Sequence, residues 1–309
     1  SGKSTQIPRL CAALGRGVDG RIAVTQPRRL AARAIATRLA EECAVELGTG
    51  VGWRTRFERR DGPATRIEVM TDGVLAASIG RDPRFGAYDT VIVDEAHERS
   101  VVIDLLLGTL KRAVEVRDDL RVVVASATIA ADRFAAFFGG APIVEIPGRQ
   151  HPVEILHRPF EAGPEAGRGR DRDAALLEAT GEAVDEALER QGGAPGDVLV
   201  FLPTTRAIDD LAELLAGRLG PKVPLLPLHA RLDAAAQDAA FRRPSGPRVI
   251  LATNVAETSL TLPWVRSVVD TGLARVRRYD PRRRIARLRV EPIARANAAQ
   301  RAGRCGRVG

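Results

Sequence analysis

The stretch that decides the fold class is Tyr88–His97, with the sequence YDTVIVDEAH. Its apolar run Val91-Ile92-Val93 is typical of a buried strand, and the run ends on two adjacent carboxylates, Asp94 and Glu95. Ligands of open α/β sheets bind at the carboxyl ends of the strands, where Asp94 can hold a metal ion and Glu95 can polarise a water molecule. The alternative interpretation is that the pair simply caps a following helix.

Strand-like and helix-like runs alternate on both sides of this stretch. Strands are expected within residues 21–26, 88–95, 121–128, 141–146, 196–203, 223–229, 247–254 and 266–272. Amphipathic helices are expected near residues 28–42, 103–116, 174–190 and 207–219. This order predicts an α/β protein with parallel sheets that carry helices on both faces.

The alternation of strand-like and helix-like runs is interrupted once, which predicts two domains. Residues 160–173 are rich in Gly, Pro and charge and have no apolar period, so they are expected to form a flexible loop or linker. The predicted domains are therefore residues 1–159 and 174–309. Within the second, two alternating runs flank the turn-forming sequence YDPR, which predicts a basic β-hairpin over Leu273–Val290.

Composition narrows the class of protein. The 309 residues are 45% hydrophobic and 28% charged, and no apolar run reaches the roughly 20 residues of a membrane span. Three dispersed cysteines predict neither a disulfide framework nor a zinc site, and a cytoplasmic protein is expected. The only methionine is Met70, so the chain is expected to be a fragment.

The positive charge is concentrated near the end of the chain. Between Arg266 and Arg307 there are thirteen arginines and three acidic residues, whereas the rest of the chain is slightly acidic. A phosphate backbone is the commonest partner of such a segment. A solvated basic face in an Arg-rich protein is an equally good interpretation of the charge alone.

Two further motifs can bind phosphate. The first residues, Ser1-Gly2-Lys3-Ser4-Thr5, match the end of a P-loop, in which Lys3 reaches the β- and γ-phosphates and the Ser4 hydroxyl binds Mg²⁺. In Gln300–Arg307, the sequence QRAGRCGR places guanidinium groups on one side of a helix start, where they suit a γ-phosphate. Taken alone, the first motif could also be a capped helix start. The second could also be a basic helix that binds a phosphate backbone.

Together, the motifs form a set with a recognisable order. The order along the chain is GKST, TQPRR at residues 25–29, TDG at 71–73, DEAH at 94–97, SAT at 126–128, VFLP at 200–203, ATNVAETSLT at 252–261 and QRAGRCGR at 300–307. This order resembles the superfamily 2 helicases, specifically the DEAH-box RNA helicases and among them the bacterial HrpA-type members. The resemblance implies two tandem RecA-like P-loop domains with parallel sheets, an ATP-dependent RNA helicase motor, and ATP and Mg²⁺ as ligands.

The resemblance also implies a role for each matching residue. Catalysis would fall to Glu95, Gln300, Arg304 and Arg307. ATP would contact Gly2, Lys3, Ser4, Thr5, Asp94, Arg38 and Phe241, with Mg²⁺ on Ser4 and Asp94. RNA would contact Arg28, Arg29, Thr71, Asn254, Thr258, Arg277, Arg278, Arg282 and Arg283.

The sequence departs from the family in two places and leaves two alternatives open. The first half of the P-loop is absent, and Pro263 stands where many splicing-type members carry an acidic residue near the ribose. The same two-domain frame also fits a translocase on DNA, because the expected contacts are with the backbone. A third reading is an RNA-binding scaffold that does not use ATP, although the complete set of catalytic residues argues against it.

Overall fold

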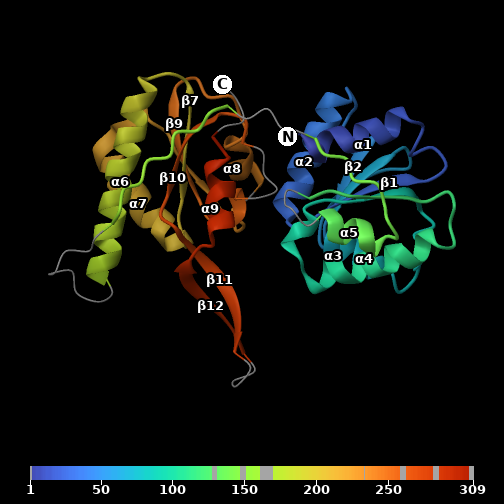
Figure 1. Ribbon diagram of the computed structural model, residues 1–309. Coiled ribbons are helices and arrows are strands. Elements are labelled where there is room, and N and C mark those ends of the chain that lie inside the picture. The colour runs from blue at the N-terminus through green and yellow to red at the C-terminus, as the bar shows by residue number, and fades with distance from the viewer. Residues whose placement is uncertain are drawn as a thin grey trace. The chain divides into compact units, whose positions relative to one another are not determined.

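The computed structural model describes residues 2–126, 131–146, 151–160, 170–232, 234–257, 262–280 and 285–305. The chain divides into two compact units, Ser1–Pro147 and Gly148–Gly309 (Figure 1). Each unit has its own parallel sheet, which confirms the α/β class predicted from the sequence. In the described residues, no helix is both long enough and apolar enough to cross a lipid bilayer.

The first unit is built on a six-stranded sheet with the order β3-β2-β4-β1-β5-β6. All neighbouring strands are parallel except β2 and β3. The strands are β1 (Arg21–Gln26), β2 (Val51–Arg54), β3 (Arg59–Arg60), β4 (Ile67–Thr71), β5 (Tyr88–Val93) and β6 (Arg121–Val124). The helical segments are α1 (Lys3–Ala13), α2 (Arg29–Glu42), α3 (Asp72–Ser78), η1 (Ala96–Glu98), α4 (Val101–Val114) and α5 (Ala131–Phe137).

Burial on both faces explains why β5 is apolar throughout. Every residue of β5 is buried, as expected for a central strand that is covered by helices on both sides. On one face Val91 and Val93 pack in a core with Ile103, Leu106 and other residues of α3, α4 and α5. On the other face α1 and α2 contact β1, and α2 also contacts β2 and β4. The two helical layers are visible around the sheet in Figure 1.

The second unit has a four-stranded, all-parallel sheet with the order β10-β7-β9-β8. Its strands are β7 (Gly196–Phe201), β8 (Leu225–Leu228), β9 (Pro247–Ala252) and β10 (Val265–Asp270). Its helical segments are α6 (Arg170–Gln191), α7 (Thr205–Leu219), η2 (Gly220–Lys222), α8 (Ala234–Ala239), η3 (Asn254–Ala256) and α9 (Arg295–Ala302). Val198 and Val200 of β7 pack against Ile208 and Leu211 of α7.

Two further strands of this unit form a separate ribbon. β11 (Leu273–Asp280) and β12 (Ile285–Pro292) pair antiparallel, from Leu273 opposite Pro292 to Asp280 opposite Ile285. Figure 1 shows this ribbon extending away from the four-stranded sheet. Tyr279, Leu288 and Val290 are exposed, so the ribbon is stabilised mainly by its own ladder of hydrogen bonds.

Two local predictions need adjustment. Residues 141–146 were expected to form a buried strand, and this is wrong: they form no strand, and Ile143, Val144 and Ile146 are exposed. The run contains Pro142, which cannot donate a hydrogen bond to a ladder. In the predicted linker, α6 already begins at Arg170, and residues 161–169 lie outside the described residues.

Candidate functional site

The residues at the start of the chain form a helix N-terminus beside the strand ends of the first sheet. α1 begins at Lys3, and Gly2 precedes it with φ of 68° and ψ of 6°, in the left-handed region that glycine adopts without strain. The Lys3 ammonium donates a hydrogen bond to the backbone carbonyl of Ser126 at 2.9 Å, just beyond β6. Thr5 donates its hydroxyl to the Gly2 carbonyl at 3.3 Å, within the same turn.

Asp94 lies at the centre of this group. Its side chain is buried at the end of β5, with 4% of the residue exposed. Oδ2 accepts hydrogen bonds from the Ser4 hydroxyl at 2.5 Å and from the Gln26 amide at 2.6 Å. Oδ1 accepts the backbone N–H of Glu95 at 2.9 Å. A hydroxyl and a carboxylate that converge on one point are a suitable pair of protein ligands for a hard cation such as Mg²⁺.

The register of the sheet explains this convergence. Gln26 is paired with Thr71, and Thr25 with Val93, so β1, β4 and β5 end at the same edge. Parallel strands bring the residues that follow them to one side of the sheet, where open α/β proteins bind their ligands. Asp94 and Thr71 therefore occupy the same edge.

Glu95 has a backbone conformation that is uncommon for its residue type. Its φ of 52° and ψ of 34° place it in the left-handed region, which is costly for a residue with a Cβ atom. Such conformations concentrate at functional sites. The chain turns here from β5 into η1, and the Glu95 carbonyl accepts the N–H of Glu98 at 2.9 Å. Glu95 stands at the N-cap position of η1, but its side chain makes no capping hydrogen bond there. The cap of α4 is Ser100, whose hydroxyl accepts the N–H of Ile103 at 3.1 Å.

Two titratable side chains near Asp94 have shifted pKa values. Burial raises the pKa of the Asp72 carboxyl to about 6, and the neighbouring charges of Glu98 and Asp94 add to this shift. Burial lowers the pKa of His97 from its usual value, although Glu98 and Asp94 oppose that change. Burial thus favours the neutral form of the His97 ring, whose Nδ1 lies 3.5 Å from a carboxylate oxygen of Glu95.

The basic motif of the second unit surrounds a buried glutamate. Gln300 and Arg301 lie in α9, and Arg304 follows the helix. Arg304 is 5% exposed, and its Nε donates to the backbone carbonyl of Glu257 at 2.8 Å. Arg301 is 1% exposed, and its Nε donates to the Glu257 carboxylate at 2.8 Å. Arg307 and Thr258 lie outside the described residues.

The other residues predicted to bind ATP or RNA lie at the following places. Arg38 is exposed on α2 and pairs with Glu42 at 2.7 Å, and the partly buried Phe241 follows α8. Arg28 precedes α2 and lies 3.7 Å from Glu98, whereas Arg29 is the exposed first residue of the helix. Thr71 ends β4, and Asn254 begins η3.

The predicted contacts on the ribbon are only partly described. Arg278 is exposed on β11 and pairs with Glu291 at 2.9 Å. Arg277 belongs to β11 by its backbone, but its side chain lies outside the described part of the chain. Arg282 and Arg283 are also outside it.

Sequence reasoning assigned no role to two side chains that the structure places at these sites. Gln26 is fully buried and bonds to the same oxygen of Asp94 as Ser4 does. Arg301 is more deeply buried than Arg304 of the same motif. A polar residue at the end of an otherwise apolar strand is the signal that could have identified Gln26.

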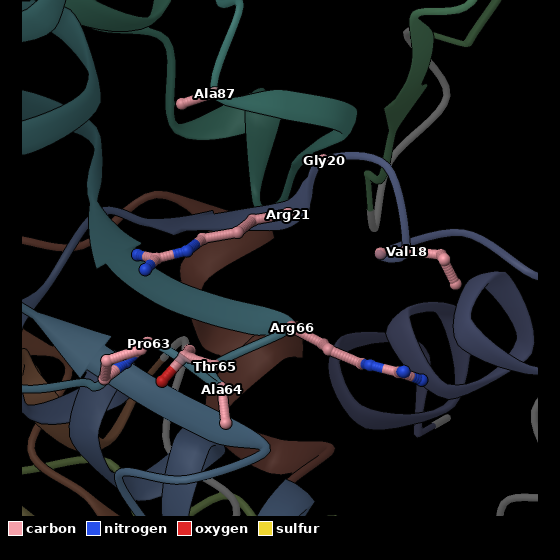
Figure 2. A pocket seen from close by; sticks show the side chains of 9 residues that line it. Val18, Gly20, Arg21, Pro63, Ala64, Thr65, Arg66 and Ala87 are labelled. Atoms are coloured by element: carbon pink, nitrogen blue, oxygen red, sulfur yellow. The ribbon is translucent and has the colours of Figure 1, made fainter.

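A pocket of about 280 Å³ in the first unit lies at the opposite edge of the sheet (Figure 2). It is lined by residues that precede or begin strands, including Arg21 at the start of β1, Arg66 before β4 and Ala87 before β5. Because parallel strands share their direction, this edge is remote from Asp94. The pocket is therefore separate from the candidate site.

Comparison with known proteins identifies the class. The model of the helicase conserved C-terminal domain matches residues 180–309. The ATP-dependent RNA helicase HrpA of Escherichia coli is 47% identical over 308 residues, and its Haemophilus influenzae homologue is 46% identical over 310. Both alignments cover 100% of this chain and 23% of the relative. The crystal structure of the E. coli DEAH/RHA helicase HrpB matches with a TM-score of 0.85 and 42% identity, over 99% of this chain and 38% of that one.

The matched domain model is that of helicases. Over its whole length the chain is similar to DEAH-box helicases of superfamily 2, and the two bacterial relatives are of the HrpA type. It spans about a quarter of the length of the curated relatives that it matches.

Proposed function

We propose that this chain is the motor region of an ATP-dependent RNA helicase, made of two RecA-like domains. One observation carries the proposal: Ser4 Oγ lies 2.5 Å from Asp94 Oδ2, at the carboxyl end of a buried parallel strand. A hydroxyl from a P-loop and a carboxylate from a neighbouring strand are the two protein ligands of Mg²⁺ in P-loop NTPases. The names of the relatives, ATP-dependent RNA helicases, support the same activity.

The donor set at Asp94 fits Mg²⁺. In the described residues no cluster of three or more His, Cys, Asp or Glu can hold a metal ion. Mg²⁺ does not need such a cluster, because it is usually bound by one or two protein oxygens together with water and substrate phosphates. Ser4 and Asp94 would supply these oxygens, and the bound ion would neutralise charge on the phosphates. Gly2, Lys3 and Thr5 would hold the triphosphate through backbone N–H groups, the ammonium and the hydroxyl.

Glu95 is the proposed general base. Its carboxylate would accept a proton from water as the water oxygen attacks the γ-phosphorus and the bond to the β–γ bridging oxygen breaks. Gln300 would orient the water, and Arg304 and Arg307 would stabilise the charge on the transferring group.

The nucleotide base and the RNA would be bound without reading sequence. Arg38 and Phe241 would stack on the two faces of the base, an arrangement with little base specificity. The proposed RNA contacts in the two domains are with backbone groups, from Arg28, Arg29, Thr71, Asn254 and Thr258. Arginines of the ribbon, including Arg277, Arg278, Arg282 and Arg283, would track the phosphates where the strands separate.

ATPase measurements on the full-length protein test the proposal. We expect ATP hydrolysis to rise when single-stranded RNA is added, and a duplex with a single-stranded tail to be unwound only with hydrolysable ATP. DNA of equal length and sequence is the comparison that tests for a DNA translocase. ATP hydrolysis that neither RNA nor DNA stimulates would contradict the proposal.

A further inference from the structure

Arg301 lies at the centre of a buried ion cluster in the second unit. Its Nε bonds to the Glu257 carboxylate at 2.8 Å, and its Nη1 bonds to Asp270 Oδ1 at 2.8 Å and to the Leu273 carbonyl at 3.2 Å. The guanidinium also stacks on the Phe201 ring, with its central carbon 4.7 Å from the ring centroid. The second oxygen of Glu257 accepts the Asn297 amide at 2.5 Å.

These contacts join four elements of the second unit. Arg301 and Asn297 belong to α9, and Glu257 directly follows η3. Asp270 is the last residue of β10, and Leu273 is the first residue of β11. Figure 1 shows α9 beside the start of the β11–β12 ribbon. One guanidinium therefore connects the helix that carries Gln300 to the base of the ribbon.

The chemistry of the cluster requires arginine. A buried charge is costly unless its hydrogen-bonding groups are satisfied, and a guanidinium presents donors in a rigid plane. Here the two donor nitrogens point to two different carboxylates and to one carbonyl. Lysine has a single, flexible ammonium group and cannot reproduce this division. The arrangement therefore fixes the position of α9 relative to both η3 and the ribbon.

We propose that Arg301 is a positioning residue that couples the phosphate-facing end of α9 to the β11–β12 ribbon. The inference rests on the proposed function and deepens it. When Gln300 and Arg304 engage a nucleotide, a displacement of α9 is transmitted through Arg301 to Asp270 and Leu273, and so to the ribbon. By reciprocity, RNA on the ribbon biases the position of Gln300 and Arg304.

Asp270 is the residue through which this coupling can be tested without losing the fold. Removing Arg301 would leave the buried Glu257 carboxylate without its positively charged partner and would destabilise the unit. The Asp270 side chain is 21% exposed, and its replacement leaves the contact between Arg301 and Glu257 in place. The test variant is Asp270→Asn in the full-length protein. The matched control is Asp210→Asn, which breaks an exposed ion pair with Arg206 on α7.

For Asp270→Asn we expect ATP hydrolysis without RNA, the KM for ATP and the melting temperature to stay close to wild type. The stimulation of ATP hydrolysis by RNA, and the number of duplexes unwound per ATP, should fall about three- to tenfold. Asp270→Glu, which keeps the charge, should restore much of both, and Asp210→Asn should match wild type throughout.

Normal RNA stimulation in Asp270→Asn would overturn the inference and leave the proposed function standing. A parallel loss of hydrolysis with and without RNA would also overturn it, because that result indicates a structural role alone. Absence of RNA stimulation in the wild-type protein would instead overturn the proposed function.

Discussion

The Ser4 hydroxyl donates a 2.5 Å hydrogen bond to Asp94, although 90 residues separate them in the chain. Gln26 donates to the same carboxylate oxygen. The start of α1 and the ends of β1 and β5 thus contribute to one point at the edge of the sheet. This geometry supports the assignment of the point to a metal-bound triphosphate, and Glu95 is the next residue along the chain.

Glu95→Gln should separate ATP binding from ATP hydrolysis. The amide has the same shape but cannot accept the proton of the attacking water, so turnover should fall at least ~100-fold. ATP affinity, measured by equilibrium binding, should stay within about threefold of wild type. Glu115→Gln is the control, because Glu115 is exposed at the end of α4. Near-normal turnover in Glu95→Gln would refute the role of general base.

Asp72→Asn should stabilise the protein in a pH-dependent manner. Burial raises the pKa of Asp72 from 3.8 to about 6. At pH values between these two, the Asp72 carboxyl is therefore protonated in the folded state and ionised in the unfolded state. The ionised carboxyl therefore destabilises the fold increasingly as pH rises through this window, and fully above it. Asparagine removes this penalty.

The expected gain in the free energy of unfolding is about 1–3 kcal/mol at pH 7.5, and close to zero at pH 4. Urea unfolding at the two pH values measures it. Asp118→Asn, which changes an exposed carboxyl, should show little change at either pH. An equal effect of Asp72→Asn at both pH values would show that charge is not the cause.

Arg248→Met should strongly destabilise the second unit. Arg248 and Asp197 form a buried bidentate pair, at 2.7 Å and 3.0 Å. Burial raises the pKa of Asp197 and Arg248 opposes that shift, so without Arg248 an unpaired charge remains buried. The expected loss is about 3–5 kcal/mol at pH 7.

This loss should be smaller at a lower pH, because burial favours the protonated form of Asp197 once Arg248 is removed. Thermal or urea unfolding measures both values. The matched control is Arg206→Met, which breaks an exposed pair with Asp210 and should change the free energy of unfolding by less than about 1 kcal/mol. Comparable effects of the two variants would contradict the importance of burial.

Neutralising ribbon arginines should flatten the salt dependence of RNA binding. Each phosphate contact on a single strand contributes about 0.7 to the magnitude of the negative slope of log affinity against log salt. The magnitude should therefore decrease by about 2 in the triple variant Arg277→Gln, Arg278→Gln and Arg283→Gln. Filter binding at several salt concentrations measures the slope. Three exposed arginines of α6 and α7, Arg172, Arg190 and Arg206, provide the control triple. An unchanged slope would remove the ribbon from the RNA contacts.

Local pattern predicted much of the fold. The strand at residues 21–26 and the helices near 174–190 and 207–219 are confirmed, and the strand expected at 88–95 forms but ends at Val93. The two strands are apolar runs buried on both faces, and the helices have apolar residues at helical spacing. The same reasoning was wrong for residues 141–146, where an apolar run around Pro142 is exposed and forms no strand. An apolar run predicts a strand only if a neighbouring strand accepts its hydrogen bonds.

The sequence by itself determined the α/β class and which residue types stand at the strand ends, because strand period, turn chemistry and motif order are local properties. Only the tertiary structure decided which of these residues meet. Gln26 reaches Asp94, and Arg301 joins Glu257 to Asp270, because of the order of strands in each sheet and the placement of α9. Those contacts span 31 to 68 residues, and packing across such separations leaves no periodic signal in the chain.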